Sequence, residues 1–328
     1  MAGFDNGMND VGTQLVPASA PSQGRSPWPL YAGVAASVAV TAWYPLVGLL
    51  LYGVVQRRVL DLDGRRALGI SAAISIAAVA VLAACVDPGL GLSLAVSIVT
   101  GYAVVALMWA HRAGVTAISI TIAVISVASL GADALLLSLQ GSDIQSVTVG
   151  LLMDSVRMSV GSGIEADMVA SAAESVLLAL WPFIYPANVA ACAAFAGAGS
   201  YGASLKSGGR PVQFASFEAP VWSVVVLALG IVAVGAALGG LPGSAFLLPA
   251  ATTVLMCVRF IFALQGYGVV IFALSRMRLG CLGRMVVIFL VVWLEVMFLV
   301  LSIVGLVDVW ANFRKLPRGG SDTKTDGR

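Results

Sequence analysis

Residues 221–274 read VWSVVVLALGIVAVGAALGGLPGSAFLLPAATTVLMCVRFIFALQGYGVVIFAL, and Arg259 is the only charged side chain among them. The turn-forming run Gly239-Gly240-Leu241-Pro242-Gly243 divides this stretch into two apolar segments. A membrane-spanning helix needs about 20 predominantly apolar residues. The stretch therefore predicts two spans joined by a tight turn. The runs are continuous, which excludes an outer-membrane barrel, whose strands alternate apolar and polar residues.

The same pattern extends along the 328 residues, of which 59% are hydrophobic and 10% are charged. Soluble domains carry about 25% charged residues, and disordered chains are low in hydrophobic residues. Both classes are excluded. We predict an all-α, polytopic transmembrane helical bundle with about eight spans, in a range of about seven to nine. The expected spans lie near residues 29–56, 67–86, 90–110, 115–139, 176–203, 221–238, 244–274 and 285–309.

The composition divides the chain into three parts. Residues 1–27 form a flexible polar N-terminal tail, residues 28–312 the transmembrane helical domain, and residues 313–328 a basic polar C-terminal tail. Between spans four and five, residues 140–175 are rich in Asp and Glu and carry a single basic residue. Apolar residues recur there at helical spacing, which predicts one amphipathic helix at the outer interface: Val147, Leu151, Leu152, Val156 and Met158.

Basic residues assign the sides of the membrane, because short cytoplasmic loops collect Lys and Arg. Four arginines between residues 57 and 66 place that loop inside. Seven crossings later the C-terminal tail would lie outside, although Arg314, Lys315 and Arg318 indicate the inside. Either a half-helix or an extra span is miscounted, or the charge rule fails at this end.

The first apolar segment, near residues 29–56, contains Pro45 directly after Tyr44. Proline removes a backbone donor and breaks the helical hydrogen-bond ladder. A break near Tyr44 is therefore expected. The segment is either one kinked helix or a helix followed by a short re-entrant half.

Two charged residues lie deep inside the last two apolar runs, Arg259 in the seventh and Glu295 in the eighth, whereas Asp308 lies at the membrane exit of the eighth. A charge at the bilayer centre costs about 2.5–3.5 kcal/mol on insertion scales, and pairing offsets that cost. We hypothesise that the two side chains pair, either as a structural ion pair or with a role in binding or coupling; snorkelling to an interface is the third interpretation. Gln265 lies about 120° around the helix from Arg259. It is either a helix–helix hydrogen bond or a ligand contact.

Pro182 and Pro186 bracket Tyr185 in the fifth predicted span. Broken helices line binding sites in many transporters, and prolines also simply kink helices. Both interpretations stay open for these three residues.

Motifs for catalysis are missing from the sequence. The chain has one histidine, its four cysteines are far apart without a CxxC pair, and it has no GxxxxGK[ST] loop. We therefore expect no catalytic residues, no metal site and no cofactor, and do not expect an enzyme. With no basic stripe, no nucleic-acid partner is expected. Primary active transport would need a partner ATPase.

Three motifs in the last third suggest a family. They are Phe217-Glu218-Ala219-Pro220, then Phe262-Ala263-Leu264-Gln265-Gly266, then a closing Gly305-Leu306-Val307-Asp308-Val309-Trp310-Ala311-Asn312-Phe313-Arg314-Lys315. In this order, over roughly residues 28–318, the chain resembles the YybS-like family of bacterial integral membrane proteins, a domain of unknown function. The most specific part of the resemblance is its terminal motif: Gly305, Asp308, Trp310, Phe313 and Arg314.

The resemblance implies the bacterial cytoplasmic (inner) membrane and a fold distantly similar to the S components of energy-coupling-factor transporters. It thereby implies a transporter-like, substrate-binding membrane component without its own ATPase. The expected partners are the lipid bilayer, a small-molecule ligand, and a coupling membrane subunit or other membrane protein. The alternative is a non-transport scaffold or regulatory protein that docks a partner, for which the terminal motif is a candidate. Trp310 also suits plain anchoring at the membrane interface.

Overall fold

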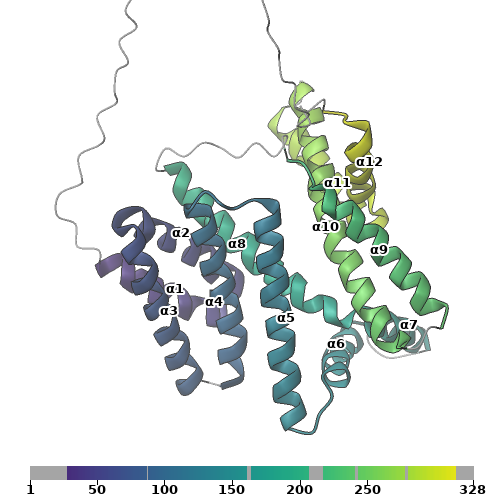
Figure 1. Cartoon of the computed structure of the whole chain (residues 1–328), viewed down its shortest axis with the longest axis horizontal. Coiled ribbons are helices and arrows are strands. Elements are labelled where there is room, and N and C mark those ends of the chain that lie inside the picture. Colours follow the sequence, from purple (N-terminus) through teal and green to yellow (C-terminus); the bar gives the residue numbers. More distant parts are fainter. Residues whose placement is uncertain are drawn as a thin grey trace, which may run out of the picture.

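The computed structural model describes residues 28–86, 88–160, 164–206, 217–240, 243–277 and 280–314, and these contain helices and turns but no strand (Figure 1). The predicted all-α class is therefore confirmed. The tails at 1–27 and 315–328 lie outside the described residues. In chain order the elements are α1 Trp28–Trp43, α2 Pro45–Asp63, α3 Arg65–Cys85, α4 Pro88–Trp109, α5 Val115–Leu139, α6 Ile144–Val160, α7 Ile164–Leu180, the 3₁₀ turn η1 Trp181–Phe183, α8 Ile184–Lys206, α9 Val221–Leu238, α10 Ser244–Arg276, α11 Cys281–Phe298 and α12 Val300–Ala311.

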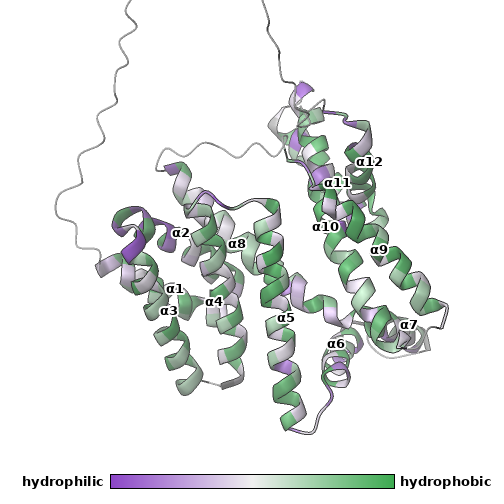
Figure 2. Ribbon diagram, in the orientation of Figure 1, coloured by the Kyte–Doolittle hydropathy of each residue, from purple (hydrophilic) through white to green (hydrophobic). Residues whose placement is uncertain are grey.

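Six helical stretches among the described residues are long and apolar enough to cross a membrane, or up to seven if the bent pair α11–α12 counts as one. The six are Arg65–Cys85, Gly89–Trp109, Val115–Leu139, Asp167–Lys206, Val221–Leu238 and Ser244–Arg276. They coincide with predicted spans two to seven. Apolar colour covers most of their length, and polar residues gather at the helix ends (Figure 2). The chain is accordingly a multi-pass membrane protein.

The first predicted span is a hairpin of two helices. The chain breaks at Tyr44, as predicted from Pro45. The Tyr31 hydroxyl at the start of α1 donates a 2.9 Å hydrogen bond to the Asp63 carboxylate at the end of α2, so α2 runs back along α1. The second limb has 19 residues, which is not the short half-helix that we considered.

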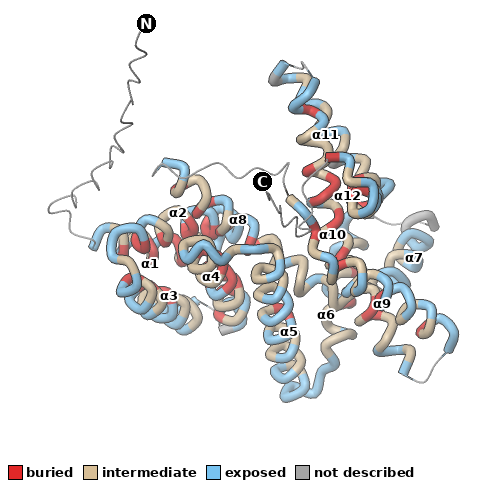
Figure 3. The backbone as a smooth tube through the Cα atoms, turned by 45° about the horizontal axis from the view of Figure 1, so that its top comes forward, coloured by how far each residue is buried: buried red, intermediate tan, exposed pale blue. Residues whose placement is uncertain are grey.

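The N-terminal half packs around α2, with α1, α3, α4 and α8 beside it (Figure 3). Its core includes Leu49 and Tyr52 of α2 and Ala196 of α8, all fully buried. A Cβ at Gly53 of α2 or Gly199 of α8 would collide with the backbone of the other helix. Small residues at this crossing let the two helices approach closely, as in other membrane bundles.

The C-terminal half packs around α10, with α9 and α12 against it. Side-chain contacts pair α10 with α12 at a constant separation of 43 residues, both from Ser302 to Arg259 and from Gln265 to Asp308. A constant difference means that the two helices run in the same direction. The helix between them, α11, must therefore return the chain, and it meets α12 at 94°. The eighth predicted span, near residues 285–309, is not one straight helix.

The acidic region between spans four and five forms two helices, α6 and α7, where one was predicted. On α6 the buried residues are Val149 and Met153, whereas Leu151 and Met158 of the predicted apolar stripe are exposed. The other three residues of the stripe, Val147, Leu152 and Val156, are half-buried. The second helix, α7, leads through η1 directly into α8.

Candidate functional site

Arg259 of α10 and Glu295 of α11 form the ion pair that we hypothesised. One Glu295 oxygen, Oε1, accepts from Arg259 Nη2 at 3.1 Å and from Nε at 3.2 Å. The side chains are 25% and 13% exposed, so the pair is half-buried. Pairing offsets the cost of both charges at membrane depth.

Glu295 also caps the first turn of α12. Ser302 donates to the carboxylate twice, from its backbone N–H at 3.0 Å and from its hydroxyl at 2.6 Å. The turn into α12 passes through Leu299, whose φ of 59° is left-handed and uncommon for leucine. The positive end of α12 and the guanidinium thus hold the same carboxylate.

Exchanging the two charges should restore only part of the stability. In Arg259→Glu/Glu295→Arg the ion pair can reform, but an arginine at position 295 cannot accept from the Ser302 N–H and places a cation at a helix N-terminus. We expect the double variant to have a thermal midpoint in detergent above both single variants and below the unmodified protein. A midpoint no higher than that of the worse single variant would contradict the pairing.

Gln265 is a helix–helix bridge. Its Oε1 accepts from the Ala219 N–H at 3.0 Å, and its Nε2 donates to Asp308 Oδ2 at 3.0 Å. It is 1% exposed. The sequence left open whether Gln265 forms a helix–helix hydrogen bond or contacts a ligand. In the structure it forms a hydrogen bond between α10 and α12. Its partners differ from those of Arg259, as their different helix faces predicted.

Asp308 and Arg314 form a second, fully buried ion pair, with side chains 2% and 1% exposed. Arg314 donates to Asp308 Oδ2 from Nη2 at 2.7 Å and from Nε at 3.2 Å. Its Nη1 donates to the Phe217 carbonyl at 2.6 Å, just before α9. The chain can turn back this way because Asn312 ends α12 in a left-handed conformation.

The three sequence motifs of the last third therefore meet at one place. Besides the polar contacts, Gly266 and Gly305 lie where α10 and α12 touch: a Cβ on either would overlap the backbone of the other helix. Trp310 and Phe313 of the terminal motif remain 65% and 52% exposed. We call the group formed by Phe217, Ala219, Gln265, Asp308 and Arg314 the C-terminal clamp.

The prolines of the fifth predicted span lie at a real interruption. Pro182 lies in the 3₁₀ turn η1, and Pro186 lies in the first turn of α8. The Tyr185 hydroxyl lies beside Asp133 of α5 and Thr148 of α6. The contacts of Tyr185 join α8 to α5 and α6, whereas the Arg259–Glu295 pair joins α10 to α11. The structure therefore does not bring all the predicted residues into one site.

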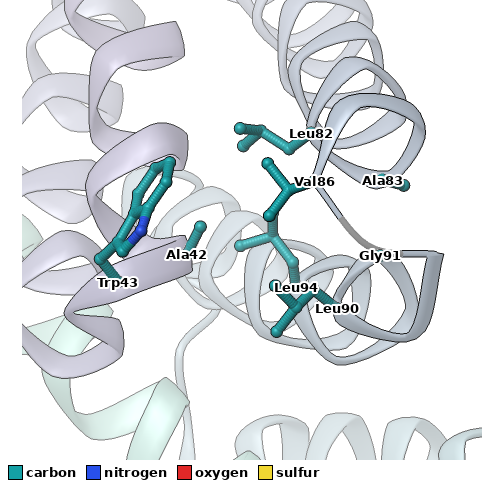
Figure 4. Close-up of a pocket in the computed structure, with 8 residues that line it drawn as sticks. All are labelled: Ala42, Trp43, Leu82, Ala83, Val86, Leu90, Gly91 and Leu94. Atoms are coloured by element: carbon teal, nitrogen blue, oxygen red, sulfur yellow. The ribbon is translucent and has the colours of Figure 1, made fainter.

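The described residues form hollows at two places that bear on ligand binding. One is a small apolar hollow at the α3–α4 turn, lined by Trp43, Leu82 and Leu94 among others (Figure 4). The other is a cleft of about 480 Å³ between α6 and α7, lined by Asp143, Asp154, Arg157 and Glu174. Of these two, the cleft between α6 and α7 offers charged groups to a ligand.

Sequence reasoning predicted the pair of Arg259 and Glu295 but missed two other contacts, the Asp308–Arg314 ion pair and the Ser302 hydrogen bonds to Glu295. Asp308 and Arg314 were identified, but their separation of six residues does not place them on one helical face. Ser302 carried no signal, because serine is common in membrane helices. The turn at Asn312 brings Arg314 back to Asp308, and the turn at Leu299 brings Ser302 to Glu295.

Among the described residues no three His, Cys, Asp or Glu side chains are grouped as a metal site would require. No family model, no curated protein and no solved structure matches this chain.

Proposed function

We propose that the chain is a transporter-like, substrate-binding component of the bacterial cytoplasmic membrane that has no ATPase of its own. The observation that carries this proposal is the broken helix pair α11–α12, at whose break Glu295 forms a half-buried ion pair with Arg259 of α10. In transporters, discontinuous helices with their ends at membrane depth form substrate sites. Irregular backbone is tolerated at that depth only where protein or a water-filled cavity surrounds it.

The proposal includes a topology. The α1–α2 hairpin begins and ends on the side of Arg66, the six candidate spans follow, and the α11–α12 pair is re-entrant. Six crossings return the chain to the side of Arg66. The basic C-terminal tail then lies inside with the other basic loops, which removes the conflict between span count and charge.

On the outer side, we assign α6 and the acidic first part of α7 to the membrane interface, as the composition of residues 140–175 suggests. The apolar remainder of the stretch Asp167–Lys206 then makes the crossing. The cleft between α6 and α7 then faces the outside. In this proposal it is the first contact for a polar solute that later reaches the membrane-embedded groups.

The test is native mass spectrometry of the purified chain in lipid nanodiscs. We expect a bound small molecule that is not a lipid, retained in Arg284→Met and lost in Arg259→Met. Arg284 is the matched control, because it is exposed on α11 and makes no ion pair among the described residues. Spectra with lipid adducts alone would contradict the transport proposal.

The second candidate is a scaffold that docks another protein. It is favoured by Trp310 and Phe313, which are exposed although the clamp holds their neighbours Asp308 and Arg314 rigidly. A retained protein without a small molecule, lost in Trp310→Ala/Phe313→Ala, would support this function instead.

A further inference from the structure

The surroundings of the Glu295 carboxylate make up a complete receptor for a carboxylate. Four donors converge on it: Arg259 Nε and Nη2, and the N–H and hydroxyl of Ser302. Donors at a helix N-terminus together with a guanidinium are the groups that proteins use to bind anions. The occupant of this receptor is a side chain of the same protein.

The receptor has unused capacity. Among the described residues, Arg259 Nη1 donates only to the Met256 sulfur at 3.8 Å, and thioether sulfur is a weak acceptor. Arg259 is also the more exposed member of the pair, at 25%. Arg259 Nη1 is therefore a further donor that a soluble carboxylate could use in addition to the four donors that hold Glu295.

The helix that supplies the occupant is weakly attached. None of the α11 side chains that the structure describes is buried, and Phe289 and Trp293 are 72% and 54% exposed. In contrast, α12 carries buried residues along its length and is fixed by the clamp. Glu295 can therefore withdraw with α11 while Arg259 and Ser302 stay in place.

We propose that Arg259, Ser302 and the first turn of α12 form an intramembrane binding site for a small carboxylate, and that Glu295 occupies this site in the resting chain. The inference rests on the proposed substrate-binding function and names its substrate class. Glu295 acts as an internal competitor: a carboxylate ligand enters when α11 moves away, and the Glu295 carboxylate returns when the ligand leaves.

The site can be tested by replacing the internal carboxylate with a soluble one. Glu295→Ala keeps Cβ and removes an acetate-sized group, so acetate is the matched probe. We expect acetate to raise the thermal midpoint of Glu295→Ala saturably at constant ionic strength, with an apparent affinity at least tenfold tighter than for the unmodified protein. Phosphatidylcholine nanodiscs carry no carboxylate lipid, so the effect there would come from the soluble anion.

Three controls restrict the interpretation. Glu295→Gln fills the same space with an amide and should not respond to acetate. Arg259→Met/Glu295→Ala lacks the guanidinium and should not respond either, and acetamide should have no effect on any variant. An equal response of Glu295→Ala and the unmodified protein, or an unchanged response after Arg259→Met is added, would overturn the inference.

The acetate experiment and the mass spectrometry experiment can give opposite results, so failure of the carboxylate site can be distinguished from failure of the transport proposal. If acetate has no effect on folded Glu295→Ala while mass spectrometry finds a bound small molecule, the carboxylate site is wrong and the transport proposal stands. If Glu295→Ala binds acetate while the unmodified chain carries only lipid, the site stands and the transport proposal is wrong.

Discussion

Arg314→Met is expected to lower the free energy of unfolding by about 3–5 kcal/mol, the range for removing one partner of a buried ion pair. The substitution leaves the Asp308 carboxylate 2% exposed without its guanidinium. It also removes the hydrogen bond to the Phe217 carbonyl, which links the end of α12 to the start of α9. Reversible unfolding in mixed micelles, followed by tryptophan fluorescence, measures the loss.

Arg284→Met is the matched control, since it removes an exposed arginine of the same region. It should change the stability by a small fraction of that amount. Asp308→Asn/Arg314→Met should be less damaging than Arg314→Met alone, because no charge is then left buried. If Arg314→Met and Arg284→Met had equal effects, the C-terminal clamp would not stabilise the fold.

Gly305→Val is expected to cost about 3 kcal/mol, at the upper end of the usual cost of overpacking. The glycine lies where α12 meets α10, and an added Cβ would collide with the Phe262 carbonyl. A carbonyl is backbone, so the neighbour cannot rotate away and the helices must separate. We expect a lower thermal midpoint and a loss of protection of the α12 amides in hydrogen exchange.

Gly235→Val provides the comparison for this effect. Gly235 lies on the exposed side of α9 with nothing within 4 Å of an added Cβ. The change from glycine to valine alters helix propensity by a similar amount at both positions, so the difference between the two variants reports the packing. Equal thermal midpoints for the two variants would mean that α10 and α12 do not pack at Gly305.

Hydropathy and local rules predicted much of this fold. Predicted spans two to seven coincide with helices, and Pro45 located the break at Tyr44. The cost of an unpaired charge in the bilayer predicted from the sequence that Arg259 and Glu295 pair, as they do in the structure. These features depend on local composition or on the membrane as a solvent, both of which a single sequence contains.

Features that depend on chain direction were not predictable. Residues near 285–309 are apolar apart from Glu295, Ser302 and Asp308, so hydropathy shows one span. The left-handed Leu299 nevertheless turns the chain between α11 and α12. The left-handed Asn312 similarly brings Arg314 back onto Asp308. On α6, the apolar spacing was real, but packing selected Val149 and Met153 instead of Leu151 and Met158.

The central claim is that α11 and α12 return the chain to the side on which α10 ends, and the side of the C-terminal tail tests it most directly. Single cysteines at Ser321, Arg66 and Ser142 can be introduced after replacing Cys85, Cys192, Cys257 and Cys281, and labelled with a membrane-impermeant maleimide. We predict that Ser321→Cys follows Arg66→Cys, protected in right-side-out vesicles and labelled in inverted ones, while Ser142→Cys shows the opposite pattern. Labelling of Ser321→Cys together with Ser142→Cys would contradict the re-entrant pair and restore a full eighth span.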